Sequence, residues 1–163
     1  FEAAAFTNLA HEHLDFHRTM DEYGAAKALL FRSLSSDKAA VINLDDASAG
    51  GIIRKTAARI ITYGITGHAD VRPAGAISHS ISGLSFSLST PAGEIGIESS
   101  LVGRHNIYNI LAAVGLGIAL GFSGETVAAG IEERRQLGVD MPIISMPSGT
   151  ADQIERTLGT LVR

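Results

Sequence analysis

The residues best suited to chemistry lie near the start of the chain, in the stretch FTNLAHEHLDFHRTMDEYGAAKALLF at residues 6–31. Imidazoles and carboxylates alternate there over seven residues, and a lysine follows in what reads as a helix: His11, Glu12, His13, Asp15, His17 and Lys27. Imidazole nitrogens and carboxylate oxygens are common protein ligands of zinc and magnesium. This stretch therefore raises the question of a metal site.

Three interpretations fit this stretch. A zinc-binding helix of the H-E-x-x-H type needs a second histidine where Asp15 stands, and the flanking TNLA does not resemble a long helix. A zinc hydrolase using His11 and Glu12 is therefore the least favoured. A polar loop with solvated histidines is the second interpretation. The third is a magnesium site in which one histidine joins carboxylate and phosphate oxygens.

The elements that must position these residues alternate between strand and helix. The run AAAF at residues 3–6 predicts a short buried strand, and Asp21–Leu34 predicts an amphipathic helix with acidic residues in its first turn. AAVIN (Ala39–Asn43) and ARIITYGI (residues 58–65) are rich in apolar and β-branched residues, which is typical of buried strands. Between them we expect the loop LDDASAGG and a short helix over Ile52–Ala58.

A small antiparallel β insert is expected over about residues 68–102. Serine alternates with apolar residues in GLSFSLST, and a PAG turn and EIGIESSLV follow. We then expect a mostly buried helix over His105–Leu120 and a second helix that Ser123 caps and that runs through Arg135. A strand-like MPIISM and a helix from Thr150 end the chain. This order predicts an α/β fold in which helices flank a mostly parallel sheet.

The composition excludes several classes of protein. With 163 residues, 45% hydrophobic and 18% charged, the chain is a globular domain with a core. A net charge of −4 without a Lys/Arg cluster argues against nucleic acid. The absence of cysteine excludes disulfides and thiolate chemistry and fits a reducing compartment. No apolar run approaches the roughly 20 residues of a membrane span, and the start does not resemble a signal peptide, so we expect no membrane partner and a cytoplasmic location.

Three glycines in a later segment mimic part of a dinucleotide-binding fingerprint. They are Gly115, Gly117 and Gly121. That fingerprint requires a strand before the glycines and a helix that opens after them. Here the glycines fall within an expected helix, where they allow close packing, so we predict no NAD site.

The segment TNLAHEHLDFHRTMDEYGAAKALLF resembles the Mur ligase family, the ATP-dependent amino-acid ligases of peptidoglycan precursor synthesis. It is most similar to the branch that adds the third residue to UDP-N-acetylmuramoyl-dipeptide. Two further matches follow in order, VINLDD at Val41–Asp46 and GRHNIYNILAAVGLGIALG at Gly103–Gly121. The resemblance covers about Ala5 to Arg135 and implies the second half of the family's central ATP-binding domain, over residues 1–138.

The resemblance implies roles for individual residues. His13 matches a ligand of the catalytic Mg²⁺, and Lys27 matches the family's carbamylated lysine. A free ammonium, with a pKa of about 10.4, would repel Mg²⁺, whereas reaction of the neutral amine with CO₂ yields an anionic oxygen ligand. GRHNIYN faces the ATP base in the family, so His105, Asn106 and Asn109 are candidates for nucleotide binding. A side-chain amide suits adenine because it donates and accepts hydrogen bonds simultaneously.

The residues alone leave simpler interpretations open for the same positions. Lys27 would be a solvated lysine on a helix, and Asn106 would cap a helix start. Asp45 and Asp46 could neighbour the nucleotide, but a turn after a strand explains them equally well.

In the family's reaction, ATP phosphorylates the carboxylate of the UDP-muramoyl-peptide and the amine of an amino acid attacks the resulting acyl phosphate. ADP and phosphate leave as the amide forms, and Mg²⁺ neutralises and orients the phosphates. The family's phosphate-binding loop ends in Gly-Lys-Ser/Thr. In this chain Lys27, Lys38 and Lys55 follow Ala, Asp and Arg, so no Gly-Lys pair is present.

The absence of the Gly-Lys pair of the phosphate-binding loop predicts that this chain is a truncated or degenerate portion of a ligase and is inactive by itself. The alternative is a non-catalytic Mur-like module for binding or oligomerisation. Residues 139–163 are expected to be a remnant of the start of the C-terminal domain, in which only Thr150 and Asp152 match the family's motif. A missing phosphate-loop strand would expose an edge of the sheet, which predicts self-association.

Overall fold

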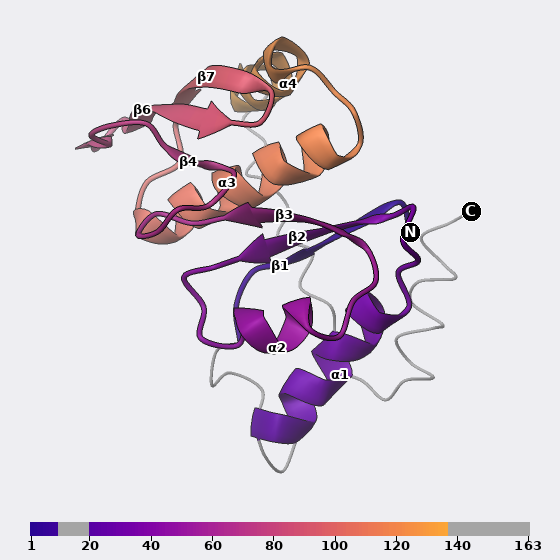
Figure 1. The fold of residues 1–163 in the computed structure, drawn as a ribbon. Helices are drawn as coiled ribbons and strands as arrows, with labels where there is room; N and C mark the ends of the chain where they lie inside the picture. Colours follow the sequence, from indigo (N-terminus) through magenta and orange to yellow (C-terminus); the bar gives the residue numbers. More distant parts are fainter. Residues whose placement is uncertain (10–19, 137–163) are drawn as a thin grey trace.

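A three-stranded parallel sheet forms the centre of the computed structural model, which describes residues 1–9 and 20–136 (Figure 1). The strands lie side by side in chain order: β1 (Ala3–Phe6), β2 (Ala39–Asn43) and β3 (Arg59–Tyr63). Phe6 pairs with Ile42, and Asn43 pairs with Tyr63, so the strands end at nearly the same level. The carboxyl ends of the strands therefore meet at one edge of the sheet.

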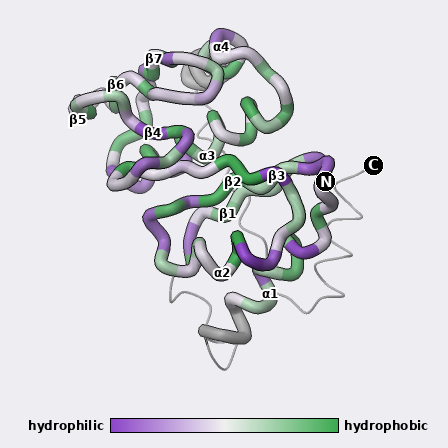
Figure 2. The backbone as a smooth tube through the Cα atoms, viewed as in Figure 1, coloured by the Kyte–Doolittle hydropathy of each residue, from purple (hydrophilic) through white to green (hydrophobic). Residues whose placement is uncertain are grey.

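Helices cover both faces of this sheet. On one face lie α1 (Met20–Arg32) and α2 (Ala49–Ile53), and on the other lies α3 (Arg104–Ala119) (Figure 1). Along β2, Ala40 and Ile42 pack toward α1 and α2, whereas Val41 packs toward α3. Because both faces are covered, β1 and β2 are almost entirely apolar, whereas the outer strand β3 also carries Arg59 and Thr62 (Figure 2).

The predicted antiparallel insert is present as a second sheet. Its strands are β4 (Arg72–Pro73), β5 (Ser78–Ser80), β6 (Gly83–Thr90) and β7 (Gly93–Ser99). β7 pairs with β6 over nearly its whole length, while β4 and β5 pair with opposite ends of β6. Leu84, Phe86 and Leu88 are buried, and Ser85 and Ser87 are exposed. The alternation in the sequence therefore reports one core face and one solvent face, as predicted.

Helix α3 lies between the two sheets and packs against both (Figure 1). Its buried residues share one hydrophobic cluster with Val41 and Ile61 of the parallel sheet and with Phe86 and Ile97 of the insert. Helix α4 (Gly124–Gln136) packs against α3 and β7.

The glycines of α3 serve close packing, as predicted. A Cβ atom added at Gly115 would lie 2.6 Å from Cγ1 of Val41 in the sheet. A Cβ atom at Gly117 would lie 2.6 Å from Cγ2 of Val127 in α4. The prediction that Gly121 also lies within the helix is wrong: it follows the helix end with a φ of 85°, and nothing lies within 4 Å of an added Cβ atom.

The helix predicted over Ile52–Ala58 is wrong, because α2 begins earlier and ends at Ile53. Asp46 starts a turn: its carboxylate accepts the N–H of Ser48 at 2.8 Å, and its carbonyl accepts the N–H of Ala49 at 3.0 Å. The chain turns into helix at that point, and Ala49 and Ile52 are buried there. Helices α1, α3 and α4 agree with their predicted bounds within two residues at each end, whereas the helix predicted from Thr150 lies outside the described residues. Ser123 caps α4, since its hydroxyl accepts the N–H of Thr126 at 3.2 Å.

The two outer edges of the parallel sheet differ. At β3 the edge is closed: the carboxylate of Asp70 accepts the N–H of Thr62 at 2.8 Å, and Gly64 donates to the carbonyl of Val71 at 3.2 Å. At β1 no strand among the described residues pairs with the outer edge. The predicted self-association therefore stays a prediction. So does the predicted C-terminal remnant at 139–163, because it lies outside the described residues.

No helix in the described ranges is long and apolar enough to span a bilayer.

Candidate functional site at the carboxyl edge of the sheet

Lys27 lies at the carboxyl edge of the parallel sheet. It sits in α1, partly buried, and its Nζ donates a hydrogen bond to the carbonyl oxygen of Asn8 at 2.8 Å. Asn8 follows the end of β1, so the amine is close to the place where ligands bind in parallel α/β sheets. His13, the predicted metal partner of Lys27, falls outside the described residues.

The loop after β1 is held at three successive residues. The Asn43 side chain donates to the carbonyl of Thr7 at 2.7 Å, Lys27 donates to Asn8, and Leu9 donates its N–H to a carboxylate oxygen of Asp46 at 2.9 Å. The end of β2 and α1 together therefore fix the course of the chain as it leaves β1. This is the segment that leads toward His13.

Asp45 joins three elements. Its carboxylate accepts the N–H of Ile65 at 2.6 Å and both the N–H and the hydroxyl of Thr66, which follow β3. It also accepts the hydroxyl of Tyr108 in α3 at 3.0 Å. Gly64 permits this arrangement, since a Cβ atom there would lie 3.1 Å from Oδ1 of Asp45. Asp45 therefore ties the ends of β2 and β3 to the first turns of α3.

The hydrogen bonds to Asp45 also lower the pKa of its carboxyl group. Burial raises the pKa of the Asp45 carboxyl, but the hydrogen bonds from Thr66, Ile65 and Tyr108 outweigh burial and hold the pKa below its ordinary value. Burial and the bond to Asp45 raise the pKa of the Tyr108 hydroxyl, although Arg104 opposes this. Asp45 is thus an anion that accepts hydrogen bonds and Tyr108 a neutral donor.

The depressed pKa of Asp45 predicts a loss of stability in acid. A carboxyl whose folded pKa lies below its unfolded value of about 3.9 contributes stability above that value. This contribution disappears as the pH falls through the folded pKa. In urea unfolding from pH 6 downward, Asp45→Asn should lower stability at pH 6 and flatten the decline in acid. A decline that is as steep in the variant as in the parent chain would contradict this.

The predicted adenine residues lie together at the start of α3. The Asn109 side chain donates to Oδ1 of Asn106 at 3.1 Å, and Asn106 donates from its own amide to the carbonyl of Val102 at 2.9 Å. The helix begins after Gly103 without a side-chain cap, so the capping role considered for Asn106 is not observed. His105 is exposed in the first turn.

The two amides retain the groups that a purine base needs. Each amide nitrogen has two hydrogens and donates one hydrogen bond within the described part of the chain, so each keeps a second N–H. Within the described part of the chain, nothing donates to the amide oxygen of Asn109. A base with a ring-nitrogen acceptor and an exocyclic amino donor fits this donor–acceptor set.

A continuous series of contacts connects the two halves of the candidate site. Lys27 contacts Asn8, Leu9 contacts Asp46, and the adjacent Asp45 contacts Tyr108, which precedes Asn109. The structure thus brings Lys27 and the asparagine pair to the same edge of the sheet.

Sequence reasoning missed Tyr108, and it left Asp45 undecided between the nucleotide and a turn. The available signal was a tyrosine hydroxyl inside GRHNIYN and a pair of acidic residues at the end of a buried strand. It did not indicate that Asp45 and Tyr108 contact one another.

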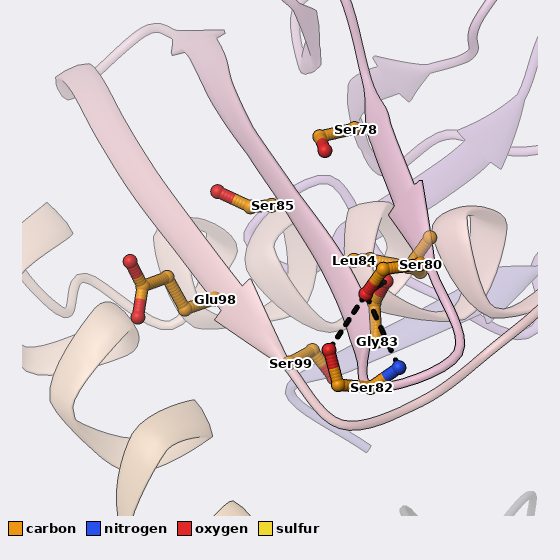
Figure 3. Close-up of a pocket in the computed structure, with 8 residues that line it drawn as sticks. All are labelled: Ser78, Ser80, Ser82, Gly83, Leu84, Ser85, Glu98 and Ser99. Atoms are coloured by element: carbon orange, nitrogen blue, oxygen red, sulfur yellow. Dashed lines mark hydrogen bonds between the residues drawn. The ribbon is translucent and has the colours of Figure 1, made fainter.

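Two alternatives, a metal site formed only by described residues and a hollow on the insert, have weaker support as functional sites. No group of three or more His, Asp or Glu side chains gathers in the described ranges, so a metal site would need His13 or other ligands together with Lys27. A shallow, serine-lined hollow lies on the insert (Figure 3). Ser80, one of the serines that line it, stabilises the β5–β6 turn, because its hydroxyl accepts the N–H of Ser82 at 3.1 Å and donates to the carbonyl of Gly83 at 3.3 Å.

Comparisons with known proteins agree with this architecture. The model of the Mur ligase middle domain matches residues 1–117. The UDP-N-acetylmuramoyl-L-alanyl-D-glutamate–2,6-diaminopimelate ligase of Bacillus velezensis is 40% identical over 175 aligned positions, which cover 98% of this chain and 36% of that protein. The enzyme of the same name from Geobacter metallireducens is 43% identical over 138 positions, covering 81% of this chain and 27% of the relative. The chain therefore spans about a third of the length of these relatives.

Solved structures give the same result. A UDP-N-acetylmuramoyl-L-alanyl-D-glutamate–2,6-diaminopimelate ligase superposes with a TM-score of 0.72 at 34% identity, over 81% of this chain and 28% of that one. MurF from Acinetobacter baumannii superposes with a TM-score of 0.74 at 26% identity, over 81% of this chain and 29% of that one. The sequence, the two-sheet fold and these similarities together show that the chain belongs to the Mur ligase family.

Proposed function

We propose that this chain is the portion of an ATP-dependent UDP-N-acetylmuramoyl-peptide:amino-acid ligase that holds the adenine base and supplies two ligands, His13 and Lys27, to the catalytic Mg²⁺. The observation that carries the proposal is the position of Lys27 and of the Asn106–Asn109 pair at one edge of the sheet. The similar enzymes are named as ligases that join UDP-N-acetylmuramoyl-L-alanyl-D-glutamate and diaminopimelate. UDP-muramoyl-peptide and an amino acid are accordingly the proposed substrates, and the cytoplasm is the proposed location.

Different residues would hold the adenine base and the metal ion. The amides of Asn106 and Asn109 would hold the base through its amino group and ring nitrogen. Lys27, as a carbamate, would supply an anionic oxygen to Mg²⁺, with His13 as a second ligand. When bound, Mg²⁺ neutralises the phosphates. Asp45 is unsuited to a metal, because its oxygens already accept hydrogen bonds from Ile65, Thr66 and Tyr108.

The 163 residues by themselves should hold the base but not the phosphates, because they contain no Gly-Lys pair. In NMR titrations, adenosine and ATP should bind with similar millimolar affinity, and Mg²⁺ should add little. The perturbed amides should cluster at the start of α3. Asn109→Ala should weaken adenosine binding roughly tenfold, by loss of hydrogen bonds to the base, whereas His79→Ala, an exposed change on the insert, should leave it unchanged.

Other outcomes would contradict separate parts of the proposal. Micromolar, Mg²⁺-dependent binding of ATP would show a phosphate site within these residues. An absence of adenosine binding would reject the adenine site and favour the alternative of a non-catalytic Mur-like module.

A further inference from the structure

The start of α3 has no side-chain cap. Arg104 and His105 are exposed, and the N-cap residue Gly103 provides no side-chain hydrogen bond to the first turn. The first N–H groups of a helix have no partner within the helix, so an uncapped start tends to fray. The asparagine pair lies in and just after this uncapped turn, where, among the described residues, the Asn106 side chain bonds only to the carbonyl of Val102 and the amide of Asn109.

The contact between Tyr108 and Asp45 supplies support from outside the helix. Tyr108 is partly buried, and its hydroxyl donates to Oδ2 of Asp45 at 3.0 Å. Asp45 is itself held by the N–H of Ile65 at 2.6 Å and by Thr66. Asp45 follows β2 and is bonded to residues that follow β3, so the parallel sheet fixes its position independently of α3.

This contact bears directly on the position of the amides. Tyr108 immediately precedes Asn109 and follows Asn106 by two residues, so anchoring its ring fixes the rotation of that turn about the helix axis. Hydrogen bonds to a base require donor–acceptor distances near 3 Å, and a small rotation would misplace both amides together.

We propose that Asp45 and Tyr108 form a positioning pair that places the Asn106–Asn109 amides for a purine base and thereby sets the preference for adenine over guanine. The pair acts through the asparagines and does not touch the base. This inference rests on the proposed adenine site.

Two variants separate positioning from general stability. Tyr108→Phe and Thr66→Val each remove one hydroxyl that donates to the same carboxylate, but only Tyr108 belongs to α3. In NMR titrations of the whole 163-residue chain with adenosine, Tyr108→Phe should weaken binding roughly three- to tenfold, the effect of one misplaced set of hydrogen bonds. The weak binding of guanosine should change less, so the preference for adenosine should fall. Thr66→Val should change adenosine affinity less than twofold.

Equal weakening in both variants, or an unchanged preference in Tyr108→Phe, would overturn the inference. A parent chain that binds no adenosine would reject the adenine site instead. The positioning role is then decided by hydrogen exchange at the backbone amides of Asn106 and Asn109. Exchange should be faster in Tyr108→Phe than in Thr66→Val, and equal rates would overturn the inference.

Discussion

Gly83→Ala is expected to lower the stability of the fold by about 3 kcal/mol or more, through a steric clash and backbone strain acting together. Gly83 has a φ of 136°, in a region that residues with a Cβ atom rarely adopt. A Cβ atom there would lie 1.8 Å from the carbonyl oxygen of Ser99 and 2.9 Å from Cα of Ser100. Both neighbours are backbone atoms, so no side-chain rotation relieves the clash.

Gly93→Ala is the matched control for this prediction. Gly93 also has a positive φ, 105°, and lies in the same sheet, but nothing lies within 4 Å of an added Cβ atom. It should show the backbone strain alone, about 1–2 kcal/mol. Urea unfolding of both variants measures the difference, and similar losses for the two would show that the contact with Ser99 is unimportant.

Leu111→Ala should cost about 2–5 kcal/mol, because it opens a cavity where α3 meets both sheets. Leu111 is completely buried and belongs to the hydrophobic cluster that includes residues of β2, β3, β6 and β7. The surrounding backbone is held in two sheets, so the site has little freedom to collapse around the missing atoms.

The control for this cavity is Leu120→Ala, at the C-cap of the same helix, where the leucine is 50% exposed. This change should stay within about 0.5 kcal/mol. Thermal unfolding followed by circular dichroism distinguishes the two variants. A small effect of Leu111→Ala would mean that α3 is not the common core of the two sheets.

Much of the fold could be predicted because the sequence patterns follow burial directly. Val41 and Ile42 lie in a continuous apolar run because both faces of β2 are covered, whereas Ser85 and Phe86 alternate because only one face of β6 is. The short helix α2 was misplaced because two glycines, poor helix formers, stand inside it. A turn set by the carboxylate of Asp46 and the burial of Ile52 outweighs that propensity.

The candidate site was predictable in part. Lys27 and the asparagine pair were predicted from motifs, and the structure brings them to the same edge of the sheet, while their roles stay predictions. The bond between Tyr108 and Asp45 joins residues 63 positions apart, so it depends on how α3 is placed against the sheet. No local pattern carries that information, because a tyrosine inside a helix and an aspartate after a strand are each common by themselves.

The position of α3 between two sheets limits how this protein can be divided. Antiparallel inserts often look like separable modules, but this one shares a single hydrophobic cluster with α3 and the parallel sheet. Excising residues 72–99 would uncover the side of α3 that packs on Phe86 and Ile97. In chimeras between Mur ligases, crossover points between β3 and α3 would therefore split one core between two parents, and exchange should succeed only when the insert and α3 move together.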